Sequence, residues 1–217
     1  MNTAIIIPAF NPPDTFSSLL KTIQKLTNSP IIIIDDGSIV EIKINHSDII
    51  ILRNEDNCGK GYSLIKGLQF AQNEGFTHAI TLDADSQHDP ALIDSFLKIE
   101  EDISLVLGIR KFKNNMPFHR KISNKLTSLI ISAICRHKLD DSQCGYRRYK
   151  LEDVCIESFN EKGFQFESEV LIKLLRSGKT YQNVNIPTIY GQEASSIKKI
   201  RDTFKFIRLI VRILIRY

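Results

Sequence analysis

Residues 31–38 read Ile-Ile-Ile-Ile-Asp-Asp-Gly-Ser, an apolar run that ends abruptly in two carboxylates and a turn. Other short apolar runs along the chain have the same character. They are Ala4–Ile7, Ile49–Leu52, Ala79–Leu82 and Leu105–Leu107. Continuous apolar character, β-branched residues and short length together predict strands that are buried on both faces.

Segments with apolar residues at helical spacing lie between and after these runs. They cover residues 14–26, 62–73, 90–99, 118–136 and 166–176. A polar loop over 140–147 and a further strand near 183–186 are also expected. Alternation of strands and helices predicts the α/β class, with a Rossmann-like, mostly parallel sheet flanked by helices on both faces.

Composition narrows the function classes further. The chain has 217 residues and a net charge of +4, which suits one ordinary domain and gives no reason to expect a nucleic-acid partner. Its four cysteines are scattered and form no C-x-x-C pair, so we expect reduced thiols and a cytoplasmic protein. No apolar run approaches the ~20 residues that span a bilayer.

Polar residues gather where the predicted strands end, and ligands bind at the carboxyl ends of the strands in such sheets. Asp83 and Asp85 follow one buried strand, with Gln87 beside them. Carboxylate and amide oxygens at this spacing favour a hard divalent cation, Mg²⁺ or Mn²⁺, bridging a diphosphate. A solvated acidic loop is the alternative interpretation.

Cationic residues suited to phosphate lie near the same edge. Lys60 stands between two glycines that open a predicted helix, although neither the dinucleotide fingerprint nor the P-loop pattern is present. Arg110 ends a predicted strand, and Arg120 and Asn124 share a face of the next helix. Arginine makes two-bond contacts with phosphate, but a lone arginine is as often merely solvated.

The C-terminal segment has a pattern of its own. Its basic residues fall on one narrow stripe of a helix, and apolar residues fill the rest; the stripe is Arg201, Lys205, Arg208, Arg212 and Arg216. We expect 1–197 to form the catalytic domain and 198–217 to form a basic amphipathic helix. The stripe favours contact with an anionic membrane surface, and a helix packed on the domain is the alternative.

Eight motifs in order resemble family 2 glycosyltransferases of the GT-A fold, in particular the dolichol- and polyprenol-phosphate glycosyltransferases. The resemblance runs from about Thr3 to Ser196. The motifs are Ile7–Asn11, Ile34–Ser38, Asn57–Gly61, Leu82–Pro90, Gly108–Arg110, Asp141–Arg147, Phe166–Glu169 and Ile186–Pro187.

The resemblance implies a role for each candidate residue. The donor, a GDP- or UDP-sugar, would contact Pro8, Phe10, Asn11, Asp35, Asp36, Lys60, Asp83 and Ala84. Asp83, Asp85 and Gln87 would hold the metal, and Arg110 and Arg120, with Asn124 nearby, would receive the acceptor phosphate. The family usually has an acidic residue after the first strand that contacts the nucleoside, and this chain has Pro12-Pro13 there. The choice between a GDP- and a UDP-sugar therefore stays open.

The expected reaction is metal-dependent, inverting sugar transfer to a polyprenyl phosphate, at the cytoplasmic face of a membrane. Transfer to a saccharide or lipopolysaccharide hydroxyl is the runner-up, and it would need a general base, for which Asp141 is the candidate. The sequence also leaves open a nucleotidyltransferase and a degenerate, non-catalytic subunit. A separate membrane protein is a further candidate partner.

Overall fold

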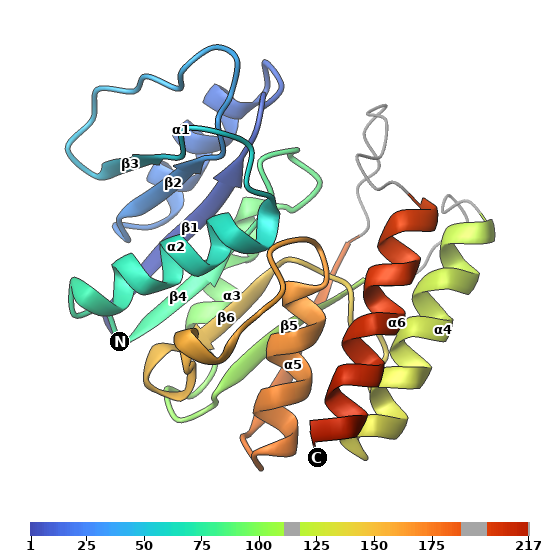
Figure 1. The fold of residues 1–217 in the computed structure, drawn as a ribbon. Coiled ribbons are helices and arrows are strands. Elements are labelled where there is room, and N and C mark those ends of the chain that lie inside the picture. The colour runs from blue at the N-terminus through green and yellow to red at the C-terminus, as the bar shows by residue number, and fades with distance from the viewer. Residues whose placement is uncertain (111–117, 188–198, 217) are drawn as a thin grey trace.

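The computed structural model describes the backbone of residues 1–110, 118–187 and 199–216. Side chains are described over 1–110, 122–187 and 201–215, so those of Arg120 and Arg216 lie outside the described residues. The described chain forms a mixed α/β domain in which helices cover both faces of one central sheet (Figure 1).

The sheet has seven strands in the order β3-β2-β1-β4-β6-β5-β7. Their bounds are β1 Thr3–Ala9, β2 Ile31–Asp35, β3 Ile49–Arg53, β4 His78–Thr81, β5 Leu105–Arg110, β6 Arg147–Lys150 and β7 Tyr181–Ile186. Strand β6 runs antiparallel to β4 and β5, and the other pairs are parallel. The predicted class is therefore confirmed, with one antiparallel strand that the sequence pattern did not reveal.

The helices divide between the two faces of the sheet. They are α1 Phe16–Leu26, α2 Lys60–Asn73, α3 Ile93–Leu97, α4 Phe118–Cys135, α5 Phe166–Arg176 and α6 Lys199–Arg216, with short 3₁₀ turns at Pro90–Leu92, Leu151–Asp153 and Ile156–Ser158. Residues of α1 and α3 share one core cluster, and residues of α2, α4, α5 and α6 share the other. Ile5 and Ile6 belong to opposite clusters, as expected for a strand buried on both faces.

The sequence analysis predicted no strand at β6, whose first residue, Arg147, ends the predicted polar loop and whose sequence is Arg-Arg-Tyr-Lys. Both arginine side chains are nevertheless buried, and their guanidinium groups donate hydrogen bonds to backbone carbonyls. Arg147 bonds Ser142, Cys144 and Glu167, and Arg148 bonds Phe96, Ile99 and Glu100. Three hydrogen bonds from each guanidinium group to backbone carbonyls offset the cost of burying these cations, which a hydrophobicity pattern cannot show.

Helix α6 packs on the domain through Leu209 and Ile213, both buried in the larger core cluster. The described residues of the basic stripe are divided: Arg201 and Arg208 are exposed, whereas Lys205 and Arg212 are half-buried. Arg212 turns inward to carboxylates of the domain, whereas Phe204 and Leu214 are exposed. No helix within the described ranges is long and apolar enough to cross a bilayer.

Candidate active site

A cleft of about 940 Å³ opens at the carboxyl ends of β1, β4 and β5, where the sequence predicted a ligand site. Most of the predicted site residues line it: Pro8, Phe10, Asn11, Asp36, Lys60, Asp83, Ala84, Asp85, Gln87 and Arg110. The chain brings these residues together because parallel strands end at a common edge. Asn11 also fastens this edge, since its side chain accepts a 2.9 Å hydrogen bond from the Ile39 backbone.

Three predicted site residues do not line the cleft. Asp35 and Asp141 are buried behind it, and Asn124 lies on α4 away from its wall. Arg120 falls in the first turn of α4, and its side chain is outside the described residues. In this structure Asp35 is buried and does not line the cleft, and its contact with the donor stays a prediction.

Asp35, the last residue of β2, and Asp36, which follows it, accept hydrogen bonds from different parts of the chain. Asp35 accepts backbone hydrogen bonds from Ser38 and Ile42 and pairs with Arg53, and these bonds lower its pKa although burial alone would raise it. Asp36 accepts bonds from the Cys58 and Gly59 backbone at 3.0 and 2.8 Å. The pair therefore shapes the loop that leads into α2.

That loop places Lys60 at the first position of α2. Gly59 precedes it with φ +99°, and a Cβ there would lie 2.7 Å from the Lys162 carbonyl oxygen. Only glycine tolerates this conformation together with so close an approach. The start of α2 is thereby held against the loop 161–164, which forms part of the cleft wall.

Lys60 forms the electrostatic centre of the cleft. Its Nζ lies 2.6 Å from Asp83 Oδ1 and 3.1 Å from Glu167 Oε1. Burial alone would raise the pKa of Asp83, but the neighbouring ammonium holds that pKa at about 2. Burial would lower the pKa of Lys60, and the two carboxylates instead raise it above its usual value. Asp83 and Lys60 are therefore both charged at neutral pH.

The residues of this cleft fit a divalent cation. Asp83 and Asp85 both line the cleft, and 28% of the surface of the Asp83 side chain is exposed. Within the described ranges, no group of three or more His, Cys, Asp or Glu side chains forms a closed cage. Mg²⁺ in nucleotide sites is commonly held by one or two carboxylates, water and substrate phosphates, so two carboxylates at an open cleft match that chemistry.

Arg110 is held in the cleft wall by Asp141. Its Nε and NH2 atoms donate to the two carboxylate oxygens of Asp141 at 2.7 and 3.0 Å. The Asp141 carboxylate is fully buried, whereas 22% of the Arg110 side chain is exposed. This arrangement favours a positioning role for Asp141 and argues against the general-base role considered for it.

His88 supports the Asp83 loop from behind. Its Nδ1 accepts a 3.2 Å hydrogen bond from the Asp83 backbone, and its Nε2 lies 3.8 Å from Cys144 Sγ. Burial lowers the pKa of His88, so the ring is neutral and can accept that bond. We assign it to the support of the loop.

Several functional residues had no predicted role. Glu167 shares Lys60 with Asp83, and Gly145 leaves the space for this cluster, since a Cβ there would lie 2.9 Å from both Lys60 Nζ and Glu167 Oε1. Arg201, Asp202 and Lys205 of α6 also line the cleft. The motif containing Glu167 was visible in the sequence, but only the fold places α6 against the cleft.

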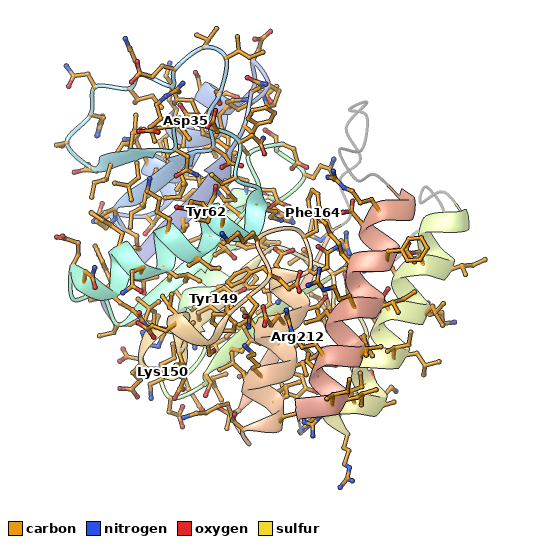
Figure 2. The ribbon with its side chains drawn as sticks, viewed as in Figure 1. Asp35, Tyr62, Tyr149, Lys150, Phe164 and Arg212 are labelled. Carbon is orange, nitrogen blue, oxygen red and sulfur yellow. The ribbon has the colours of Figure 1, made fainter. Side chains whose placement is uncertain are left out.

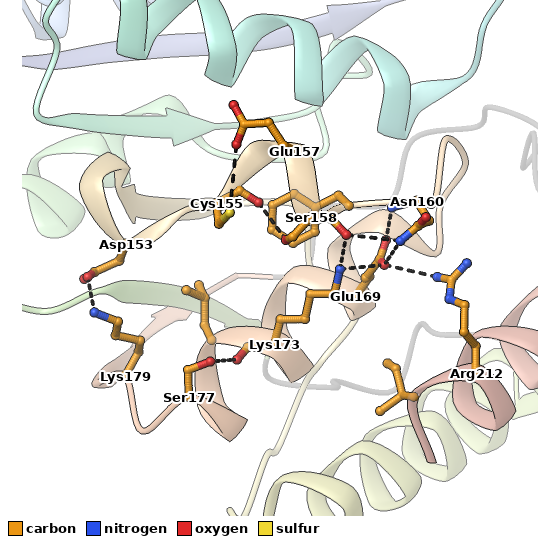
Figure 3. Close-up of a pocket in the computed structure, with 13 residues that line it drawn as sticks. Asp153, Cys155, Glu157, Ser158, Asn160, Glu169, Lys173, Ser177, Lys179 and Arg212 are labelled. Carbon is orange, nitrogen blue, oxygen red and sulfur yellow. Dashed lines mark hydrogen bonds and ion pairs between the residues drawn. The ribbon is translucent and has the colours of Figure 1, made fainter. Parts of the chain in front are cut away.

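A second cavity of about 510 Å³ lies between α5, α6 and the segment 153–160 (Figure 3). Its centre is Glu169, which accepts backbone bonds from Asn160 and Glu161 and pairs with Lys173 and Arg212. Arg212 projects from α6 (Figure 2) and pairs with Glu169 (Figure 3). The charged groups that line this cavity pair with one another, and the pair between Glu169 and Arg212 connects α5 to α6.

Comparisons with known proteins agree with this geometry. An archaeal protein of Methanocaldococcus jannaschii, described as uncharacterized, is 34% identical over 92% of this chain and 95% of its own. The UDP-N-acetylglucosamine–dolichyl-phosphate N-acetylglucosaminyltransferase of Methanococcus voltae is 30% identical over 87% and 86%. The undecaprenyl-phosphate mannosyltransferase of Micrococcus luteus is 23% identical over 86% and 83%.

Among solved structures, glucosyl-3-phosphoglycerate synthase of Mycobacterium tuberculosis, with Mn²⁺, UDP and phosphoglyceric acid, superposes with a TM-score of 0.73. That likeness is at 17% identity and covers 99% of this chain and 78% of the other, so it shows a shared GT-A fold. The sequence family described as glycosyl transferase family 2 matches residues 4–168. The chain therefore belongs to glycosyl transferase family 2 and is a glycosyltransferase.

Proposed function

We propose that this protein transfers a sugar from a nucleotide-diphosphate sugar to a polyprenyl phosphate, with Mg²⁺ or Mn²⁺. One observation carries the proposal: a single cleft holds the Asp83–Asp85 pair together with the anchored Arg110. Carboxylates that face a diphosphate need a cation between them, and an arginine in the same cleft suits a second anionic substrate. The named activities of the two relatives above support the choice of acceptor.

The proposed reaction is a single displacement. An acceptor phosphate oxygen attacks the anomeric carbon of the donor sugar. The bond between that carbon and the diphosphate oxygen breaks, and the nucleoside diphosphate leaves with the electron pair. The configuration at the anomeric carbon is therefore inverted. A cation held by Asp83, Asp85 and Gln87 would supply charge neutralisation of the leaving diphosphate. Arg110, fixed by Asp141, binds the acceptor phosphate and offsets its repulsion by the donor.

A phosphate acceptor also fits the bonding of Asp141. The second pKa of a phosphate monoester is about 6, so the acceptor is anionic at neutral pH and needs no proton removed. A saccharide hydroxyl would need a general base, and both oxygens of Asp141 are already bonded to Arg110. The geometry thus favours the lipid phosphate over the hydroxyl acceptor.

The outer surface of α4 and α6 supports a membrane location. Both helices contribute to one core cluster and run alongside each other in Figure 1. Both helices expose large apolar side chains, beside exposed polar ones such as Lys125 and Arg208: Ile122, Leu126 and Leu129 on α4, and Phe204, Ile207, Val211, Leu214 and Ile215 on α6. We propose that this surface lies in the cytoplasmic face of a membrane, where it would meet a lipid acceptor.

A transfer assay tests the function. Purified protein is mixed with Mg²⁺ or Mn²⁺, a short polyprenyl phosphate and a panel of radiolabelled GDP- and UDP-sugars, and label is followed into the lipid fraction. We expect one donor to label the lipid and Asp85→Asn to abolish labelling. Metal-dependent release of nucleotide without labelled lipid would contradict the acceptor but not the donor.

Sedimentation with anionic vesicles tests the location. Leu214→Glu places a charge on the α6 surface and should weaken sedimentation at least fivefold. Val40→Glu places the same charge on another exposed apolar residue, in the loop between β2 and β3, and is the control, because it leaves the proposed surface intact. Equal sedimentation of the two variants would overturn this location.

A further inference from the structure

Helix α6 forms part of the wall of the candidate active site as well as an outer surface. Its Asp202 carbonyl accepts a 3.1 Å hydrogen bond from the Gln165 side chain, next to the loop 161–164. One turn later Lys205 lines the cleft beside Gly163. A Cβ atom added to Gly163 would lie 3.7 Å from Lys205 Nζ. The first turns of α6 and the Asp83–Asp85 pair therefore face the same space.

The inward cations of α6 differ in their partners. Arg212 is bound by two carboxylates, Glu161 at 3.0 Å and Glu169 at 3.1 Å (Figure 3). Lys205 is half-buried and, over the described side chains, forms no ion pair with a carboxylate. Since Arg212 fixes the helix, Lys205 is held at the cleft without a carboxylate at ion-pair distance among the described side chains, which leaves its ammonium available to an anionic ligand.

Helix α6 presents an apolar side and a cationic side, which match the apolar chain and the anionic head of a lipid phosphate. Phe204 and Ile207, which neighbour Lys205 in the helix, are exposed on the apolar outer surface. Lys205 itself faces the cleft. An acceptor with an apolar chain and an anionic head could contact both sides of this one helix.

We propose that Lys205 is a phosphate-binding residue of the active site, supplied by the C-terminal helix. The proposal rests on the proposed function and adds a contact beyond Arg110. The phosphate belongs either to the acceptor head or to the donor diphosphate, because both are anions of the same cleft. In either case, removal of the charge should weaken substrate binding without preventing α6 from docking, since Arg212 and Leu209 hold the helix.

The test compares Lys205→Gln with Arg208→Gln in the full chain. Each variant removes one positive charge from α6, but Arg208 is exposed and does not line the cleft. Titration calorimetry in Mg²⁺ measures the Kd of UDP, of GDP and of farnesyl phosphate, a short prenyl monophosphate, so binding is read without turnover. Thermal melting checks that both variants are folded.

We expect Lys205→Gln to raise the Kd of one ligand about tenfold, Lys205→Arg to restore most of that affinity, and Arg208→Gln to change it less than twofold. A raised Kd for farnesyl phosphate assigns the contact to the acceptor, and a raised Kd for the nucleotide assigns it to the donor. Equal Kd values in Lys205→Gln and Arg208→Gln would overturn the proposal. A wild-type protein that binds these ligands but labels no lipid would instead contradict the proposed function.

Discussion

The ammonium group of Lys60 lies 2.6 Å from Oδ1 of Asp83, one of the two carboxylates proposed to hold the metal. Lys60 also reaches Glu167 at 3.1 Å, so one cation bridges two acids from different elements. A divalent cation at Asp83 would therefore meet a carboxylate whose charge Lys60 already compensates in part. Lys60 keeps the two acids close together and holds Asp83 in its charged form, as binding of a metal-linked diphosphate requires.

This bridge predicts an unusual response to metal. Lys60→Gln leaves Asp83 and Glu167 facing each other without a cation, which should cost about 2 kcal/mol of folding free energy in chelator. Added Mn²⁺ should then raise Tm more in the variant than in the wild type, because it neutralises Asp83. Thermal melts with and without metal check this, with Lys21→Gln on the exposed side of α1 as the control. An equal metal-induced shift in both proteins would show that the cation does not use Asp83.

The pairing of Asp141 with Arg110 predicts how Asp141→Asn fails. The amide can no longer hold both guanidinium bonds, so we expect the acceptor KM to rise about tenfold as Arg110 loses its orientation. The pH–rate profile should keep its shape, since no proton passes through Asp141. Asp140→Asn changes the exposed neighbour and should behave as wild type. Loss of the acidic limb of the profile in Asp141→Asn would restore the general-base assignment.

Gly145 predicts a binding defect that is separable from stability. In Gly145→Ala the new Cβ would stand within 3.1 Å of Lys60 Nζ, Glu167 Oε1 and Asp83 Oδ1, so these side chains must move apart. We expect the Kd of the nucleotide with metal to rise at least tenfold. Gly75→Ala provides the opposite pattern, because its φ of +77° strains the fold while no atom lies near. It should lower Tm and leave nucleotide affinity unchanged, and a similar Kd for both variants would refute this role of Gly145.

His78 predicts how stability depends on pH. Burial lowers its pKa below the ordinary value of 6.5, and its Nε2 lies 2.9 Å from the Glu101 carbonyl oxygen. As pH falls through 6.5, the unfolded chain binds a proton before the folded protein does, so the free energy of unfolding must fall. Urea unfolding at pH 7.5 and 5.5 should show this loss, and His78→Gln should reduce it. An unchanged pH dependence in the variant would assign the loss to other groups.

The strand ends were the most predictable part of this molecule. Ile31–Ile34 followed by Asp35 identifies a buried strand and its carboxyl end, because apolar runs and parallel topology are local and general rules. The same rules could not distinguish Asp35, which bonds Arg53, from Asp36, which faces the cleft. That difference depends on partners about 18 to 23 residues away in sequence.

Two other features were beyond a pattern of hydrophobicity. Strand β6 begins with buried arginines that donate hydrogen bonds to backbone carbonyls, and nothing in the local sequence indicates those acceptors. The spacing of the basic residues of α6 did not show which of them would turn inward, because the position of Arg212 depends on Glu161 and Glu169 of the domain. Buried polar partnerships, rather than apolar spacing, decided these elements.

The central claim is that a phosphate monoester accepts the sugar. The most direct measurement gives the protein its preferred nucleotide sugar with Mg²⁺ and either a short polyprenyl phosphate or the matched polyprenol, and identifies products by mass. We predict that only the phosphate gains one sugar residue, and that Arg110→Gln suppresses this product. Transfer to the polyprenol hydroxyl, or equal use of both acceptors, would contradict the claim.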